Sequence, residues 1–129
     1  MRKRLLIIED NPLVIHAYQL LLKDYPNIQP LFTERGDETL TLLDTLAHPL
    51  DLIFLDYGLP DMDGFVLAQR LRRQKGVRCP IIVISTNAIS PLMQGHHHPL
   101  IQRFYQKPLR SDQFQQIIER YLSNPLQAF

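Results

Sequence analysis

The sequence has few of the features that mark secreted, membrane-spanning or nucleic-acid-binding proteins. It holds a single cysteine, Cys79, so an internal disulfide is excluded and a reducing compartment is expected. No apolar run approaches the length of a membrane span, and the run near the N-terminus is too short for a signal peptide. The formal net charge of +1 gives no field that would attract a nucleic acid or a membrane surface. These absences predict a cytoplasmic protein without direct nucleic-acid or membrane binding.

The sequence does contain enough apolar residues for one compact domain. Of its 129 residues, 45% are hydrophobic and 21% are charged, as in ordinary globular proteins. Unbroken apolar runs are typical of strands buried on both faces of a parallel sheet, and three occur here: residues 5–8, 52–55 and 81–84. Two weaker strands are predicted over residues 28–33 and 102–106. The first of these belongs at a sheet edge, because Pro30 removes a ladder donor.

Helical patterns alternate with these strands. Asn11 and Pro12 form a start signal for a first helix that is expected to end near Tyr25. Its apolar spacing predicts an inner face made of Leu13, Ala17, Leu20 and Leu21. Further helices are predicted over residues 37–46, 65–74 and about 112–122, with a short or distorted one between residues 89 and 103. Five strand–helix repeats predict one domain over residues 1–129, a parallel sheet with helices on both faces.

Polar residues stand where four of the predicted strands end. The first strand is followed by Glu9 and Asp10, the third ends at Asp56, the fourth at Ser85 and the last at Lys107. Parallel strands bring their C-terminal ends to one edge, which is where open α/β sheets bind ligands. Three carboxylates in close quarters raise one another's pKa unless a cation lies among them. Mg²⁺ suits such oxygen ligands, and the lack of Cys and His at these ends argues against zinc or copper.

A metal held by acids beside a carboxylate, a hydroxyl and a lysine suits phosphoryl transfer. A carboxylate can take a phosphoryl group as an acyl phosphate, while the metal and Lys107 neutralise its oxygens. Each residue also has a plain structural interpretation: an acid pair at a helix start, an Asp in a turn, a polar strand end or a solvated lysine. It is improbable that the polar residues at all four strand ends have only a structural role.

The pattern resembles the receiver domain of bacterial response regulators, the CheY-like superfamily, from Leu5 to about Leu122. The resemblance is carried by the acid pair after the first strand and by the block over residues 56–64, which reads Asp-Tyr-Gly-Leu-Pro-Asp-Met-Asp-Gly. Ser85 and the Lys107–Pro108 dipeptide complete it. It implies a flavodoxin/CheY-like five-stranded sheet in the order 2-1-3-4-5. The start of the first helix is most similar to receivers of the NarL type, which usually precede a DNA-binding domain; no such output domain follows here.

The resemblance also implies roles for individual residues. Asp56 would accept a phosphoryl group from a phosphohistidine of a sensor histidine kinase or a histidine phosphotransfer protein. Asp10, Asp56 and the backbone carbonyl of Gly58 would ligate Mg²⁺, with Glu9 acting directly or through water. Mn²⁺ is expected to be able to replace Mg²⁺. The domain would catalyse only its own phosphorylation and dephosphorylation.

The remaining implied roles concern the switch and the output. Ser85 and Lys107 would bind phosphoryl oxygens, Phe104 would swing toward the space that Ser85 leaves, and the bond before Pro108 would be cis. Phe104 also has a plain core interpretation. The usual output or dimerisation face departs from the family between residues 89 and 103, where His96-His97-His98 is expected to be a solvated loop. A homodimer and an output domain beyond this chain are both compatible with the sequence.

Three alternative functions remain. A phosphatase of the haloacid dehalogenase type has a second Asp two residues after its nucleophile, where this chain has Gly58. A nucleotide- or flavin-binding module needs a Gly-rich loop after the first strand, and none follows Ile8. A receiver-like scaffold or dimerisation module that works without phosphorylation would not need the complete set of acids, Ser85 and Lys107.

Overall fold

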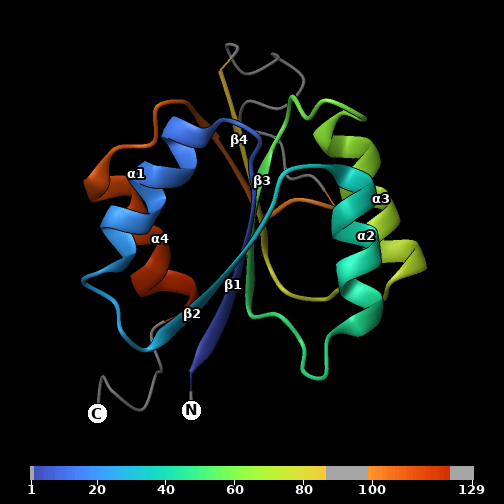
Figure 1. The fold of residues 1–129 in the computed structure, drawn as a ribbon, viewed down its shortest axis with the longest axis horizontal. Helices are drawn as coiled ribbons and strands as arrows, with labels where there is room; N and C mark the ends of the chain where they lie inside the picture. The colour runs from blue at the N-terminus through green and yellow to red at the C-terminus, as the bar shows by residue number, and fades with distance from the viewer. Residues whose placement is uncertain (1, 87–98, 123–129) are drawn as a thin grey trace.

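The computed structural model describes residues 2–86 and 99–122, which fold around one parallel sheet (Figure 1). The sheet has five strands in the order β2-β1-β3-β4-β5, and every neighbouring pair is parallel. The strands are β1 (Lys3–Ile8), β2 (Ile28–Thr33), β3 (Leu52–Asp56), β4 (Ile81–Ser85) and β5 (Arg103–Gln106). Both the parallel sheet and its predicted order are confirmed.

Four helices in the described residues cover the sheet on its two faces. They are α1 (Pro12–Leu22), α2 (Gly36–Thr45), α3 (Gly64–Gln74) and α4 (Ser111–Tyr121). Figure 1 shows α1 and α4 on one face and α2 and α3 on the other. Alternate side chains of the central strands therefore enter two separate cores: Leu5 and Ile7 belong to one, Leu6 and Ile8 to the other. His96–His98 and most of the predicted distorted helix, over residues 89–98, lie outside the described residues. Residues 99–102, which follow, form a turn, a bridge and a bend and no helix.

The inner face of α1 agrees with the prediction only at Leu21, which is partly buried against the core, whereas Ala17 is exposed. Leu13 and Leu20 are 79% and 50% exposed, whereas Tyr18 and Leu22 are buried. Tyr18 packs its ring 5.7 Å from that of Phe54 on β3, so the large aromatic sets the rotation of the helix about its axis. The helix also ends at Leu22, and the next turn closes with the Tyr25 N–H donating to the Leu22 carbonyl. This rotation leaves Leu13 and Leu20 facing solvent.

The edge strand β2 is protected against pairing with another chain. The Lys3 N–H donates to the Asn27 carbonyl and the Glu9 N–H to the Thr33 carbonyl, so the odd-numbered residues of β2 bond to β1. Pro30 therefore faces the open side, where it offers no N–H, and Arg2 donates to the outward carbonyl of Ile28. A proline and a bound carbonyl on an open edge both discourage strand addition. This confirms the predicted edge position of the strand.

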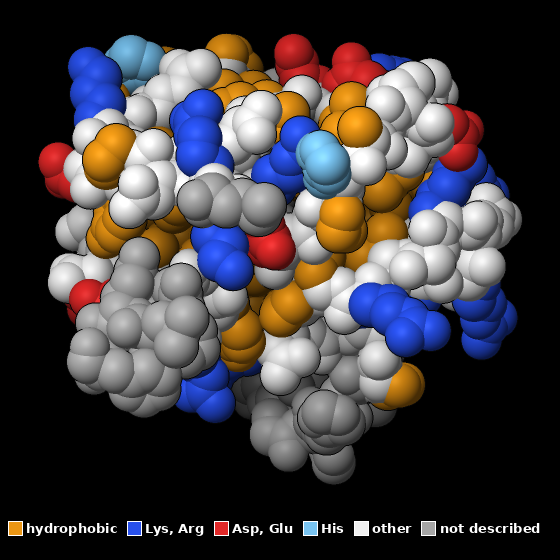
Figure 2. Space-filling view, turned by 90° about the horizontal axis from the view of Figure 1, so that it is seen from below, with side chains coloured by type: hydrophobic (Ala, Val, Ile, Leu, Met, Phe, Trp, Pro, Cys, Tyr) orange, Lys and Arg blue, Asp and Glu red, His pale blue; other side chains and the backbone are white. Residues whose placement is uncertain are grey.

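Basic residues gather where the strands begin, opposite the end that holds the predicted site. Figure 2 views the molecule from the end where the strands begin, and it shows Lys and Arg side chains spread across this face together with Asp and Glu. By their place in the chain, the basic residues at the start of β1 and those between α3 and β4 lie at this end: Arg2, Lys3, Arg4, Lys75 and Arg78. No helix in the described part of the chain is long and apolar enough to cross a membrane.

Arg72 and Cys79 lie where α3 turns back into β4. The half-buried Arg72 guanidinium donates to the carbonyls of Val77, Cys79 and Leu100 and so joins the start of β4 to the segment before β5. Burial raises the pKa of the Cys79 thiol to about 11. The thiol is therefore protonated at neutral pH, where thiolate chemistry is suppressed. These facts, and its contact with the core, indicate that Cys79 is a packing residue.

Candidate phosphorylation and metal site

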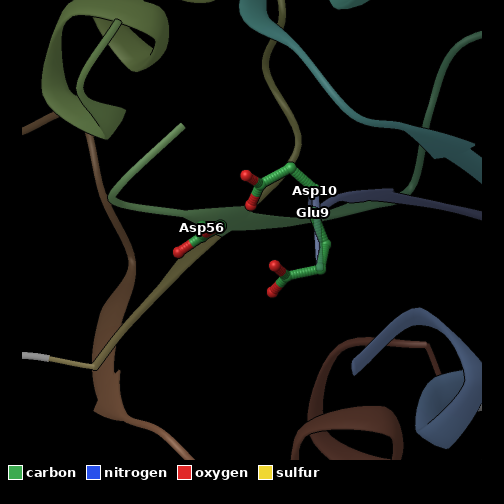
Figure 3. Close-up of side chains that lie close together, drawn as sticks. All are labelled: Glu9, Asp10 and Asp56. Carbon is green, nitrogen blue, oxygen red and sulfur yellow. The ribbon is translucent and has the colours of Figure 1, made fainter. Parts of the chain in front are cut away.

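Three carboxylates meet where β1 and β3 end. The two strands are neighbours in the sheet and pair Ile8 with Leu55, so the acids that follow are level with each other. One oxygen from each of Glu9, Asp10 and Asp56 can be chosen so that all three lie within 4.8 Å of one another (Figure 3). Glu9 and Asp56 are only 2% and 7% exposed, whereas Asp10 is exposed. The site is thus a shallow acidic pocket with one side open.

Lys107 reaches this pocket from the end of β5. Its Nζ lies 2.6 Å from Glu9 Oε1 and 3.4 Å from Asp56 Oδ1, and its side chain is only 11% exposed. The Lys107 N–H donates to the Ser85 carbonyl at 2.7 Å, which fixes the start of the lysine against β4. The Lys107–Pro108 peptide bond is cis, as the resemblance implied. The ammonium offsets part of the negative charge of the two buried acids.

Burial and neighbouring charges determine the electrostatics of Glu9. Burial raises the pKa of the Glu9 carboxyl; Lys107 and the Asn11 N–H oppose the rise, and the charge of Asp56 adds to it. Because its pKa is raised, the Glu9 carboxyl holds its proton more tightly in the folded protein than in the unfolded chain. It therefore stabilises the fold at low pH, and this contribution is lost as the pH rises through the raised pKa. A cation among the three acids would favour the ionised form. Carboxylate oxygens are the ligands that Mg²⁺ prefers, so the residues present fit that ion.

The loop after Asp56 is tight, and at Gly64 the backbone approaches so closely that a side chain would not fit. The Gly58 N–H lies 3.3 Å from Asp56 Oδ1, and Gly58 forms a bridge with Asp63 across the loop. The Gly64 N–H donates to the Tyr57 carbonyl at 2.7 Å, and a Cβ on Gly64 would lie 2.9 Å from Tyr57 Cα. Asp63 then caps α3 by accepting from the Val66 N–H. The loop therefore returns directly from the carboxylate into a helix and keeps Gly58 beside the acids.

Ser85 and Phe104, the two predicted switch residues, lie on neighbouring strands. Ser85 ends β4 and is 4% exposed; β4 pairs with β3 so that Ile84 is level with Asp56. The hydroxyl is therefore one residue beyond the carboxylate along the same sheet edge. Phe104 is half-buried and packs into the core under α2 and α3. Its packing accounts for the core interpretation, and its movement stays a prediction.

Two residues that support Glu9 were not anticipated from the sequence. The Asn11 N–H donates to Glu9 Oε2 at 3.1 Å, in addition to the expected N-cap role of the Asn11 side chain. The carbonyl of Thr33 on β2 accepts from the Glu9 N–H at 2.9 Å. Both contacts use backbone groups, for which the sequence carries no residue-specific signal. They hold Glu9 in the pocket from two sides.

Comparison with known families agrees with this geometry. Residues 5–119 match the family model of the response regulator receiver domain. The match covers most of the chain and includes four strands in full, most of β1 and all the acids of the pocket. The chain therefore belongs to the response regulator receiver domain family.

Individual relatives show how far the likeness extends. The cell cycle response regulator CtrA of Brucella ovis is 34% identical over 82 residues, which are 64% of this chain and 34% of CtrA. More generally, the matched region spans 23% to 34% of the length of the curated relatives at the head of the comparison. The likeness to these relatives is thus confined to one part of each longer protein.

Solved structures share the whole fold. The phosphorylated cyanobacterial phytochrome response regulator RcpA superposes with a TM-score of 0.79 at 26% identity, covering 95% of this chain and 96% of RcpA. The receiver domain of the sensor histidine kinase PA1611 from Pseudomonas aeruginosa superposes with a TM-score of 0.76 at 22% identity, covering 96% and 100%. The PA1611 domain is described with a magnesium ion coordinated in its active-site cleft. At that identity the second likeness supports the fold alone.

Proposed function

We propose that this chain is a phosphoacceptor switch that takes a phosphoryl group on Asp56 from a phosphohistidine on a sensor kinase or a phosphotransfer protein. The observation that carries the proposal is the placement of Asp56, a nearly buried carboxylate beside two further acids and 3.4 Å from an ammonium. In phosphoryl transfer the protein contributes mainly positioning and electrostatic stabilisation. The pocket supplies both around one nucleophile, so receiver chemistry fits it better than a plain structural role.

The metal belongs to the same proposal. Asp10, Asp56 and the Gly58 carbonyl would hold Mg²⁺, with Glu9 binding directly or through water. Two proteins of similar fold support this proposal: RcpA is described as phosphorylated, and the PA1611 domain is described with a magnesium ion in its active-site cleft. When bound, the ion neutralises charge on the phosphoryl oxygens. Mn²⁺, which also accepts oxygen ligands, is expected to substitute.

The residues of the chain then carry the transfer. A carboxylate oxygen of Asp56 attacks phosphorus, the phosphorus–nitrogen bond of the donor breaks, and the imidazole leaves with the electron pair and gains a proton. Lys107 Nζ pairs with one phosphoryl oxygen, and the Ser85 hydroxyl hydrogen-bonds another. Water can later attack the acyl phosphate and release inorganic phosphate, which makes the chain its own phosphatase. The new charge draws Ser85 and Lys107 inward, and Phe104 follows into the vacated space.

Mg²⁺-dependent uptake of phosphate from a small donor tests the proposal. Wild-type protein is incubated with acetyl phosphate or phosphoramidate and Mg²⁺, and its intact mass is measured, with EDTA as the control. We expect the mass of one phosphoryl group to be gained with Mg²⁺ and lost in EDTA. No gain with any donor would indicate a scaffold that kept the residues without the chemistry, and turnover of a generic phosphomonoester would favour the phosphatase alternative.

The docking site for the phosphodonor is proposed beside α1. A groove of about 370 Å³ runs along this helix up to the site, and its lining includes Leu13, Val14, Lys107 and Pro108. Leu13 is 79% exposed at its rim. A donor protein must bring its histidine to Asp56 past these residues, and an exposed apolar rim next to the site is suited to a protein partner.

Leu13→Asp is expected to reduce phosphotransfer from a phosphorylated histidine phosphotransfer protein by about tenfold or more, since truncating a central interface contact costs about 1–2 kcal/mol or more. Phosphorylation by acetyl phosphate should stay at the wild-type rate, because that donor needs no docking surface. Val66→Asp, on an exposed apolar residue of α3, is the matched control. Equal transfer rates for wild type and Leu13→Asp would contradict the docking site.

The output belongs to the proposal as well. A homodimer and an output domain of the NarL type are both consistent with a receiver, and CtrA is about three times as long as its matched region. The residues expected to form the output face include 87–98, outside the described residues. Domain organisation beyond residues 5–119 therefore stays a prediction.

A further inference from the structure

The loop between Asp56 and α3 is fastened to a second helix by one side chain. Asp61 Oδ1 accepts from the Gly36 N–H and Asp61 Oδ2 from the Asp37 N–H, both at 2.8 Å. Gly36 and Asp37 open α2, whose first amides have no partner within the helix. Arg35, the N-cap residue, makes no side-chain capping bond in the part of the chain that the structure describes. Asp61 thus caps α2 from a loop 24 residues further along the chain.

The surfaces of the loop and the helix are also shaped for each other. Gly36 is buried, and a Cβ at this position would lie 2.6 Å from both the Sδ and the Cε of Met62, the residue after Asp61. Real Cβ atoms essentially never approach so closely. The Met62 side chain therefore lies directly against bare backbone at the start of α2. The two hydrogen bonds and this contact hold the same short piece of loop.

The contacts of Asp61 and Met62 with α2 lie in the middle of the loop that joins Asp56 to α3. On one side are Asp56 and Gly58, joined by the 3.3 Å contact from the Gly58 N–H. On the other side are Asp63, which bridges to Gly58, and Gly64, whose N–H donates to Tyr57. The carbonyl direction of Gly58 is set by the path of this loop. A loop whose middle is released can change that direction without unfolding β3 or α3.

We propose that Asp61 is a positioning residue for the phosphorylation site. By holding the loop against α2, it keeps the Gly58 carbonyl and the Asp56 carboxylate in one metal-binding arrangement. The inference rests on the proposed function, because it assigns a role to Asp61 in that reaction. Asp61 itself touches neither the phosphoryl group nor the metal.

The test separates positioning from simple helix capping. Asp61→Ala removes both acceptors, and Asp61→Asn keeps one. Asp37→Ala is the control: it removes an exposed side chain that accepts from Arg35 and the Glu38 N–H, and it keeps the backbone N–H that donates to Asp61. Mg²⁺ affinity is measured from the rise of the melting temperature with Mg²⁺ concentration, which needs no phosphorylation. Hydrogen exchange of the Gly36 and Asp37 amides reports the fastening directly.

We expect Asp61→Ala to bind Mg²⁺ about tenfold more weakly, the lower end of the loss seen when outer partners of metal ligands are removed. Its phosphorylation by acetyl phosphate should slow at low Mg²⁺ and recover at saturating Mg²⁺. Asp61→Asn should lie between Asp61→Ala and wild type. Asp37→Ala should keep wild-type Mg²⁺ affinity whatever its melting temperature.

Two results would overturn the inference in distinguishable ways. If Asp61→Ala melts lower and exchanges faster at Gly36 and Asp37 but binds Mg²⁺ like wild type, Asp61 is a helix cap only. If wild type itself shows no Mg²⁺-dependent stabilisation and no phosphorylation, the proposed function is wrong, and the positioning role of Asp61, which depends on it, is wrong as well.

Discussion

Asp56→Asn is expected to abolish phosphoryl uptake and leave the fold intact. An amide of the same shape keeps the packing at the end of β3 but cannot form the acyl phosphate. Glu9 keeps its 2.6 Å ion pair with Lys107, and it loses a neighbouring charge that raises its pKa. The melting temperature of the variant should therefore equal or exceed that of wild type. Intact mass after incubation with acetyl phosphate and Mg²⁺ measures the uptake.

Asp63→Asn is the matched control for this prediction. Asp63 lies in the same loop and accepts from the Val66 N–H as the N-cap of α3, and Asn caps helices about as well as Asp. This variant should take up phosphate like wild type. Full phosphorylation of Asp56→Asn would show that another residue is the acceptor, and loss in both variants would point to damage of the loop.

Phe114→Ala is expected to lower the free energy of unfolding by about 3–5 kcal/mol, the usual cost of removing a buried aromatic ring. Phe114 on α4 is 1% exposed, and its ring lies 5.8 Å from Phe54, 6.2 Å from Tyr18 and 5.7 Å from Tyr25. It therefore joins β3, α1 and α4 in the core on one face of the sheet. Urea unfolding followed by far-UV circular dichroism measures the loss.

Val66→Ala is the comparison for Phe114→Ala, because Val66 is 37% exposed on α3. Surface changes of this kind usually stay within about 0.5 kcal/mol. A loss of less than about 1.5 kcal/mol for Phe114→Ala, below the range expected for a ring that leaves a cavity, would contradict the view that the aromatic cluster organises this core.

The sheet could be predicted from the sequence because its central strands carry an unambiguous pattern. The apolar runs before Glu9, before Asp56 and at Ile81 have no polar break, and only strands covered on both faces tolerate this. The strand order followed from the resemblance to receivers. Glu9 and Asp56 could be located for the same reason. Each follows directly after an apolar run, so it lies at the C-terminal end of a strand.

The rotation of α1 could not be predicted from spacing alone. Leu13, Leu20 and Leu21 fall at helical intervals, but so do Val14, Tyr18 and Leu22. Of the first set only Leu21 packs against the core. The second set is the inner one because the Tyr18 ring packs against Phe54 and Phe114. That contact joins α1, β3 and α4, which are far apart in the sequence, so the local pattern carries no signal for it.

Asp61 escaped the sequence analysis for a related reason. Its position within residues 56–64 indicated only a turn, and its two partners are backbone amides far away in the sequence. Backbone donors carry no residue-specific signal, so a cap supplied by a distant loop becomes visible only in the structure. The same holds for the carbonyl of Thr33 that fixes Glu9.

The most direct test of the central claim is the position of the phosphoryl group. Protein phosphorylated by acetyl phosphate with Mg²⁺ is reduced with borohydride, which converts an aspartyl phosphate into homoserine, and is then analysed by peptide mass spectrometry. We expect homoserine at residue 56 and unmodified Asp10, Asp61 and Asp63. Reduction at another acid, or a phosphoryl group that resists borohydride on a serine or histidine, would contradict it.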